Sequence, residues 1–223
     1  MLAVMDGDPK LLFFDAEEEA RAQITLSPPG PGLVFHDDEG TARAIFALTD
    51  EGPMIEFSQK GGKKGAKLVV STDGASLELA DSKGGLKVVL DSSGDSPKLL
   101  MCDAKGRPRA VLHIQGEPAL MLFDEGGEAT VSIRMANGEP TISLTGKGGR
   151  GLLSLGFQAA SSGLALCDEA GTPRAGILIQ GSKQAISLWD SKGRTVFTAP
   201  KTARPRRADR SVSGANSVQK KGE

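Results

Sequence analysis

The sequence lacks the features that define several common functional classes. It contains no tyrosine, one tryptophan, two cysteines and two histidines. No run approaches the roughly 18 apolar residues that a transmembrane helix requires, and the opening MLAVMDGD is too short for a signal peptide. We therefore expect a soluble protein, cytoplasmic by default, with no membrane span.

The few reactive side chains do not fall into a site pattern. Cys102 and Cys167 occupy the same place in two repeats that are three repeats apart, which favours reduced, small apolar residues over a disulfide. His36 and His113 have no third partner at a meaningful spacing and are expected to be structural. Calcium loops place several acids in one turn, whereas each turn here has one fixed acid. We expect no catalytic residue, no cofactor, no metal and no enzyme activity.

What the sequence does contain is a repeat of about 22 residues, the separation of Asp15 and Asp37. Nine units occupy residues 11–200, each with an apolar strand, an Asp-x-x-Gly turn, a second apolar strand and a Gly/Pro exit. Asp accepts hydrogen bonds from its own turn and Gly adopts positive φ, so one turn type is predicted throughout. The aspartate position is filled by Asp15, Asp37, Gln59, Asp81, Asp103, Asp124, Gly146, Asp168 and Asp190, and glycine follows three residues later in every unit except the first, which has Glu18.

Apolar residues alternate along both strands of every unit. They stand two and four residues before the aspartate position and seven and nine residues after it, as Leu99, Met101, Ala110 and Leu112 do. This alternation indicates a sheet with one buried face. If the two strands of a unit pair, sharing that face requires an even-numbered loop, and a four-residue loop satisfies the requirement. Strands that stack on neighbouring units, as in a solenoid, are the alternative.

The repeat predicts an all-β protein, an elongated β-solenoid or β-hairpin array of nine two-strand units. A closed barrel or sandwich is the second alternative, and an intertwined trimer is the third. The single domain covers residues 11–200 after a lead-in over 1–10. Residues 201–223, with seven Lys and Arg against two acids, predict a disordered basic tail. Stacked as solenoid coils, nine units would give a rod of about 43 Å.

Two sets of residues are candidates for a partner surface. The face opposite the apolar columns carries Phe14, Phe123 and Trp189, which indicates cover by a second layer or by another subunit in a homo-oligomer. Arginine recurs six residues after the aspartate, and the candidates there are Arg43, Arg109 and Arg174. We expect cross-turn ion pairs worth at most about 1 kcal/mol at the surface. The alternative is a basic edge that binds a surface polysaccharide or another anionic polymer; nucleic acid is not expected, because only the tail is basic.

Several units resemble a known group of sequences, among them LMCDAKGRPRAVL, LALCDEAGTPRAGILI and ISLWDSKGRTVFTAP. They are similar to uncharacterised bacterial proteins built from tandem L-x-L-x-D-x-x-G-x-x-R-A-x-L units that close on W-D-x-x-G-x-V-x-x-x-P. The likeness covers residues 11–200 and implies a β-repeat protein, in some relatives preceded by a membrane anchor. The period is more loosely similar to YD-type and choline-binding β-repeats, whose aromatic signatures this chain lacks. The expected function is non-catalytic: a scaffold, spacer or binding surface for a protein or polysaccharide partner.

Overall fold

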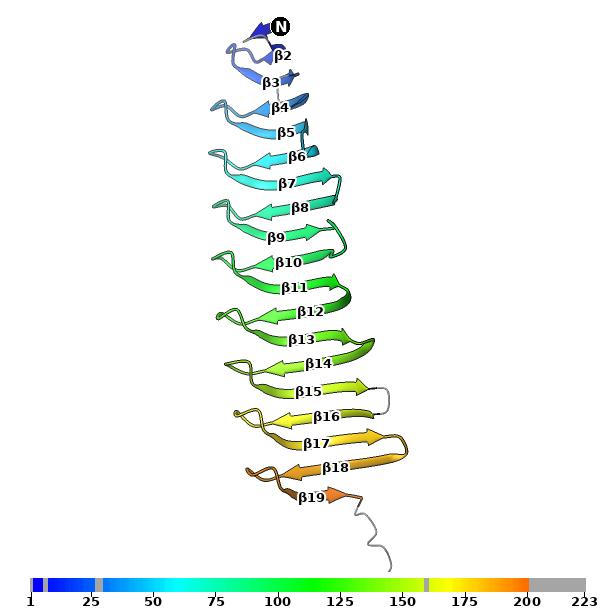
Figure 1. The fold of residues 1–223 in the computed structure, drawn as a ribbon. Coiled ribbons are helices and arrows are strands. Elements are labelled where there is room, and N and C mark those ends of the chain that lie inside the picture. Colours follow the sequence, from blue (N-terminus) through cyan, green and yellow to red (C-terminus); the bar gives the residue numbers. More distant parts are fainter. Residues whose placement is uncertain (1, 6–7, 27–29, 159–160, 201–223) are drawn as a thin grey trace, which may run out of the picture.

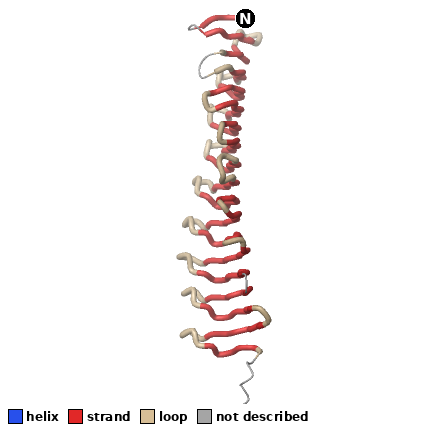
Figure 2. Tube along the Cα trace, turned by 45° about the vertical axis from the view of Figure 1, so that its right-hand side comes forward, coloured by secondary structure: helices blue, strands red, loops and turns tan. Residues whose placement is uncertain are grey.

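The repeats form one open antiparallel sheet of 19 strands in the computed structural model (Figure 1). The structure describes residues 2–5, 8–26, 30–158 and 161–200. Within these ranges there are strands and loops but no helix, and the sheet is a single layer (Figure 2). The predicted tail over residues 201–223 lies outside the described residues.

The strands follow one another along the array in chain order. They are β1 (Leu2–Met5), β2 (Asp8–Phe14), β3 (Ala20–Thr25), β4 (Gly32–His36), β5 (Ala42–Thr49), β6 (Gly52–Ser58), β7 (Lys64–Ser71), β8 (Gly74–Ala80), β9 (Leu86–Asp91), β10 (Lys98–Cys102), β11 (Pro108–Gln115), β12 (Glu117–Phe123), β13 (Ala129–Ala136), β14 (Glu139–Thr145), β15 (Gly151–Gln158), β16 (Ser161–Cys167), β17 (Pro173–Gln180), β18 (Lys183–Trp189) and β19 (Thr195–Ala199). β1 pairs with β2, so the sheet begins within the lead-in.

The hairpin array is confirmed, and the solenoid and closed-barrel alternatives are wrong. Within a unit Leu99 pairs with Leu112, and between units Leu112 pairs with Leu120, so every connection is an antiparallel hairpin. The first and last strands lie at opposite ends of the array (Figure 1). Its 19 strands span about 86 Å at about 4.8 Å per step, twice the solenoid expectation, because each unit adds two strands to the long axis.

The turn at the aspartate differs from the expected four-residue loop. In the unit of Asp103, Met101 pairs with Ala110 and Cys102 pairs with Pro108, which leaves five residues in the loop. Arg109 is the extra residue of a β-bulge on the second strand. The prediction of an even loop is wrong, but the two apolar sets still share a face because the bulge supplies the residue that parity requires.

Most connections between units are tight turns, whereas six residues join β9 to β10. Ala136 pairs with Glu139 around Asn137 and Gly138, whose φ angles of 55° and 77° suit the two-residue turns typical of hairpins. The prolines expected in the exits are placed differently in three units. Pro53, Pro118 and Pro140 lie inside β6, β12 and β14 as the second residue of each strand.

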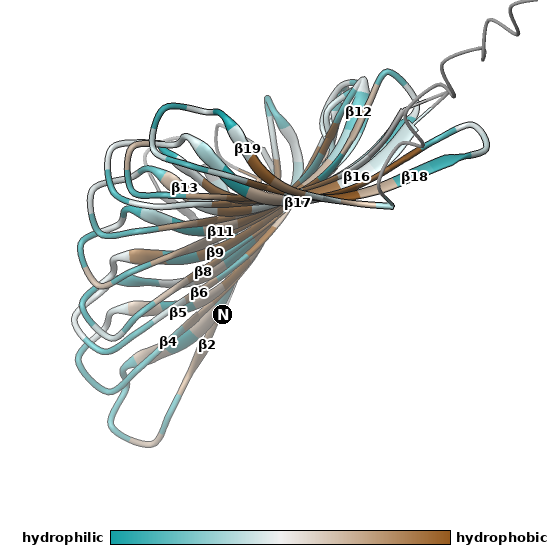
Figure 3. Ribbon diagram, turned by 90° about the horizontal axis from the view of Figure 1, so that it is seen from below, coloured by the Kyte–Doolittle hydropathy of each residue, from teal (hydrophilic) through white to brown (hydrophobic). Residues whose placement is uncertain are grey.

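The array has almost no core. Among the described side chains only Leu12, Val34 and Ala119 are buried, and all three lie on the face opposite the apolar columns. The expectation that the apolar columns are a buried face is therefore wrong for the single chain, because a one-layer sheet has nothing to cover it. Viewed along the axis, the strands fan round from β2 to β18 with the accumulated twist of an open sheet (Figure 3).

Candidate functional site

The apolar columns form two continuous ladders on one face of the sheet, which we call the regular face. In each ladder every residue pairs directly with the next, from strand to strand, as the backbone register requires. The outer ladder comprises Phe13, Ala22, Phe35, Ala44, Phe57, Ala66, Leu79, Val88, Met101, Ala110, Leu122, Val131, Leu144, Leu153, Leu166, Ala175, Leu188 and Phe197. The inner ladder comprises Leu11, Ile24, Leu33, Phe46, Ile55, Leu68, Leu77, Leu90, Leu99, Leu112, Leu120, Ile133, Ile142, Leu155, Leu164, Ile177, Ile186 and Ala199.

A third apolar column lies beside the inner ladder in part of the array. Leu48 pairs with Pro53, and Ile114 pairs with Pro118, so proline alternates with an aliphatic residue there. The proline positions predicted as strand exits thus widen the apolar surface instead of ending it.

The regular face is exposed along its length. The residue two before the aspartate position is exposed in all nine units, with Phe13 at 51% and Met101 at 49%. Neighbouring side chains touch along the face, as Phe46 and Phe57 do edge to face at 6.3 Å between ring centroids. Monomeric proteins seldom expose contiguous apolar patches above a few hundred Å², so the regular face is a candidate interaction surface.

The aspartate turns line one edge of the array, which we call the aspartate edge. The Oδ1 atom of Asp103 accepts hydrogen bonds from the amides of Lys105 and Arg107, at 2.8 and 3.1 Å. Its backbone amide donates to Arg107 O, and the Gly106 amide donates to Asp103 O. The side-chain hydrogen bond from Arg107, together with those from the backbone amides of Arg107 and Lys105, lowers the pKa of Asp103 to about 2. The predicted Asp-x-x-Gly turn is confirmed.

The turn also forms in the two units that lack the aspartate. The amides of Gln59 and Gly146 donate to Lys63 O and Arg150 O, at 2.7 and 2.8 Å, as the aspartate amide does elsewhere. Glycine has positive φ three residues later in all eight units that contain it, and Glu18 has a φ of 62°. The aspartate side chain therefore reinforces a turn that the backbone and the glycine already define.

The three candidate arginines form the expected cross-turn ion pairs. Arg43 lies 3.1 Å from Asp37, Arg109 lies 3.8 Å from Asp103, and the Arg174–Asp168 pair is closed at 2.7 Å. Each arginine occupies the bulge, which aims its side chain back over the turn.

Two of these arginines also reach the next unit, which the sequence reasoning missed. Arg43 Nε donates to Ser58 O at 2.7 Å, and Arg109 Nε donates to Phe123 O at 3.0 Å. Lys87, at the same position, donates to Asp103 O at 2.8 Å. The repeat was the available signal, since pairing of successive units places the end of the next strand beside each bulge. The cations thus link neighbouring hairpins.

The structure does not bring the six candidate residues together. Arg43, Arg109 and Arg174 lie in β5, β11 and β17, so successive arginines are about 29 Å apart along the array. Phe14, Phe123 and Trp189 end β2, β12 and β18, at separations of about 48 and 29 Å. They do not form one patch.

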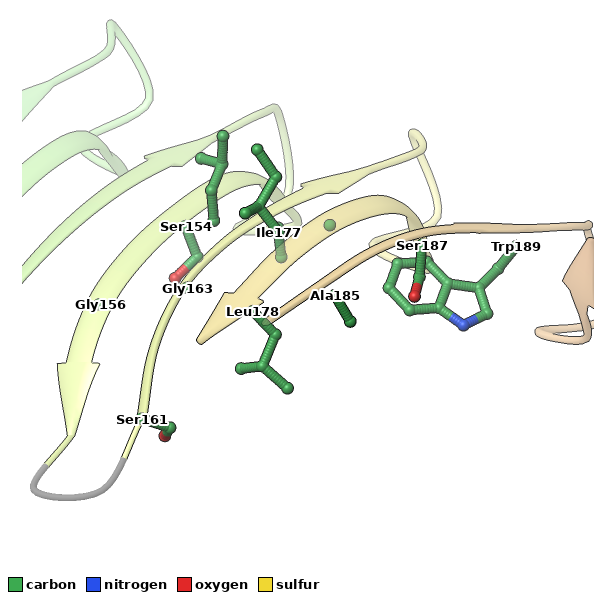
Figure 4. Close-up of a pocket in the computed structure, with 12 residues that line it drawn as sticks. Ser154, Gly156, Ser161, Gly163, Ile177, Leu178, Ala185, Ser187 and Trp189 are labelled. Atoms are coloured by element: carbon green, nitrogen blue, oxygen red, sulfur yellow. The ribbon is translucent and has the colours of Figure 1, made fainter. Parts of the chain in front are cut away.

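A concavity of about 360 Å³ lies on the face opposite the regular face, across β15 to β18. We call it the Trp189 trough. Figure 4 shows Trp189, Ser187 and Leu178 on the same side of the sheet. A Cβ atom at Gly176 would lie 3.0 Å from the Trp189 ring, so the glycine is what lets the ring approach the strand this closely. Glycine inside an apolar strand was the signal for this close approach.

The chemically reactive side chains stay apart. His36 in β4 and His113 in β11 are separated by seven strand steps, about 34 Å. Cys102 and Cys167 are both free. Across residues 2–5, 8–26, 30–158 and 161–200, no three His, Cys, Asp or Glu side chains gather as a metal site, and no helix is long and apolar enough to cross a membrane.

Comparison with known proteins adds no assignment. No protein-family model and no curated protein matches the sequence. The likeness to bacterial tandem-repeat proteins stays a prediction, and the geometry of the two faces and the aspartate edge carries the functional argument.

Proposed function

We propose that the protein is a non-catalytic β-repeat scaffold, a spacer whose surface binds other protein chains. One observation carries this proposal. All nine units form the same turn and fill both ladders with apolar residues, while the described reactive side chains are scattered over tens of ångströms. A repeat built in this way has a length set by its number of units, because each unit contacts only its neighbours.

Binding of an anionic polymer along the arginine positions has less support. Arg43, Arg109 and Arg174 each have an aspartate within 4 Å, so much of their charge is compensated within the chain. Reversing the charge of all three tests this alternative on a sulfated polysaccharide resin across a salt gradient. The scaffold proposal expects unchanged retention, and salt-sensitive binding that the reversal abolishes would favour the polymer.

Deleting one unit tests the scaffold. Removal of residues 81–102 takes out β9 and β10 and joins Ala80 directly to Asp103, so that β8 runs into an aspartate turn again. The rod should shorten by about 10 Å, two strand steps, with its β-sheet content per residue unchanged. Small-angle X-ray scattering measures the length, and circular dichroism measures the sheet content.

The matched control removes half a unit. Deleting residues 81–91 takes out β9 alone and leaves β8 and β10 running in the same direction, which a short connection cannot join. This variant should lose sheet structure at the junction. A whole-unit deletion that unfolds as the control does, or turnover of a substrate that depends on His36 or His113, would refute the scaffold.

A further inference from the structure

The regular face is large enough to be a permanent interface. Its two ladders lie two residues apart along each strand, which with their side chains gives a band about 13 Å wide, and β2 to β19 extend for about 80 Å. The area is therefore on the order of 1,000 Å², before the third column is counted, and this exceeds the roughly 800 Å² that each partner contributes to a standard stable complex. The two ladders hold no charged residue, whereas the aspartate edge beside them is polar. An apolar centre with a polar rim is the composition of an interface.

The shape of the regular face points to a particular partner. Along the outer ladder bulky Phe13, Phe35 and Phe57 alternate with Ala22 and Ala44. Larger and smaller residues of the outer ladder thus alternate every two strands, about 9.6 Å, from β2 to β13, and the alternation lapses where Leu144 pairs with Leu153 and Leu188 with Phe197. Facing layers interdigitate when large side chains meet small ones, so the matching surface needs the same period over the same length. A second copy of this chain has both.

The opposite face does not meet these conditions. Its central ladder includes Glu56, Lys67 and Glu78, paired across β6, β7 and β8. Farther along, Ser154, Ala165 and Gly176 leave it with small side chains. Between these two stretches, from β9 to β12, the same ladder is apolar. The opposite face therefore changes from charged to apolar to small along the array, and it has no ridge that repeats with the units.

We propose that the regular face packs against the regular face of a second copy of this chain. The two sheets then form the core that the single chain lacks, about 10 Å apart as in stacked sheets, with both aspartate edges at the rim. The inference rests on the proposed scaffold function, since it names the surface through which the scaffold binds.

Two neighbouring residues of β11 allow a matched test. Leu112 lies on the regular face and is 49% exposed in the single chain, whereas Val111 lies on the opposite face and is less exposed. If the protein were a single chain, Val111→Asp would destabilise it more than Leu112→Asp, because Val111 is the less exposed of the two. The proposal predicts the reverse: Leu112→Asp lowers the mass measured by light scattering to that of one chain, and Val111→Asp keeps the mass of the assembly.

A labelling experiment avoids the danger that Leu112→Asp merely unfolds. In a background with Cys102→Ala and Cys167→Ala, a cysteine replaces either Leu68 on the regular face or Lys67 on the opposite face. Leu68 is the more exposed of the two in the single chain. Assembly should invert this order, so that a maleimide modifies the Leu68→Cys protein at least tenfold more slowly than the Lys67→Cys protein.

The outcomes separate the interface from the scaffold. A mass of two chains, or of a higher whole multiple with the same protection of Leu68→Cys, supports the interface. A single-chain mass at all concentrations, or an oligomer in which Leu68→Cys reacts faster than Lys67→Cys, overturns it. A single chain that still shortens by one unit on deletion of residues 81–102 leaves the scaffold standing while the interface fails.

Discussion

The aspartate edge and the regular face are built by the same nine units, yet only the edge is complete within one chain. At the edge, Asp103 accepts two amide hydrogen bonds and meets Arg107 and Arg109, all inside a single unit. On the face, Met101 and Leu112 lie on the two strands of the same hairpin, and both remain about half exposed. Local polar interactions thus fix the hairpin, while the hydrophobic contribution to stability needs a second layer.

The turn residues and the ladder residues, which both recur through the repeats, therefore have separate roles. The turn residues set the register, which places every apolar side chain of both ladders on one face. The ladders contribute little to the free energy of folding until they are covered, because the hydrophobic contribution comes from removing apolar surface from water. Substitutions on the face and at the edge should therefore differ in size and in their dependence on protein concentration.

The largest effect is expected on the regular face. Leu112→Ala should lower the free energy of unfolding by about 2–4 kcal/mol per chain, the cost of a cavity in a closed core. In an uncovered sheet the cost would be near 1 kcal/mol, because half of the side chain already meets solvent. Urea unfolding at several protein concentrations measures both the size of the loss and its dependence on assembly. Val111→Ala is the control from the opposite face. An equal loss of stability for both variants would contradict the expectation that the regular face is the covered one.

A smaller effect is expected from strain at the edge. Gly106 has a φ of 76°, where a side chain meets the following carbonyl, and a Cβ atom there would meet nothing else within 4 Å. Gly106→Ala should therefore cost about 1–2 kcal/mol from the backbone alone. Its unfolding midpoint should shift equally at all protein concentrations, unlike that of Leu112→Ala. A shift that grows on dilution would mean that the turn also contributes to assembly.

The sequence predicted the edge better than the face, and the reason is physical. Asp103 and Gly106 act within five residues of chain, so their spacing alone specifies the turn. Arg109 was correctly paired with Asp103, but its bulge was missed because parity was assigned to loop length. For Met101, the alternation of apolar residues predicted which residues share its face of the sheet. It did not predict whether another layer covers that face.

The Trp189 trough marks a second limit of sequence reasoning. Trp189 was correctly placed on the face opposite the apolar columns, as Figure 4 shows. Its contact with Gly176 depends on the diagonal offset between β17 and β18, which only the register defines. Candidate residues taken from separate units, such as Phe14 and Phe123, cannot be assembled into a patch without the strand count between them.

Acid should weaken the edge and leave the face unchanged. The pKa of Asp81 falls from its ordinary 3.8 to about 2, chiefly through the Gly85 amide and then Lys87, and the pKa of Asp103 falls to about 2 through Arg107. A lowered pKa in the folded state stabilises the fold above the unfolded-state value of 3.8. This contribution is lost as pH falls toward 2.

Urea unfolding between pH 5 and pH 2.5 measures this loss. Stability should be nearly flat above pH 5 and should fall below pH 4. In Asp103→Asn the fall should be shallower, because one of the titrating carboxylates is gone. A slope unchanged by the substitution would show that Asp103 contributes nothing to the acid sensitivity.

The smallest effect, and the only stabilising one, is expected in the first turn. Glu18 adopts a φ of 62° where the other eight units have glycine, so it bears the strain of a left-handed backbone. Glu18→Gly removes this strain but adds freedom to the unfolded chain, and the net gain should be about 0.5 kcal/mol. Glu17→Gly is the control without positive φ and should destabilise by a similar amount. Because Glu18 lies in the turn between β2 and β3, outside both ladders, the gain should be the same in a monomeric Leu112→Asp background. A gain that disappears there would mean that even the end turn depends on the covered face.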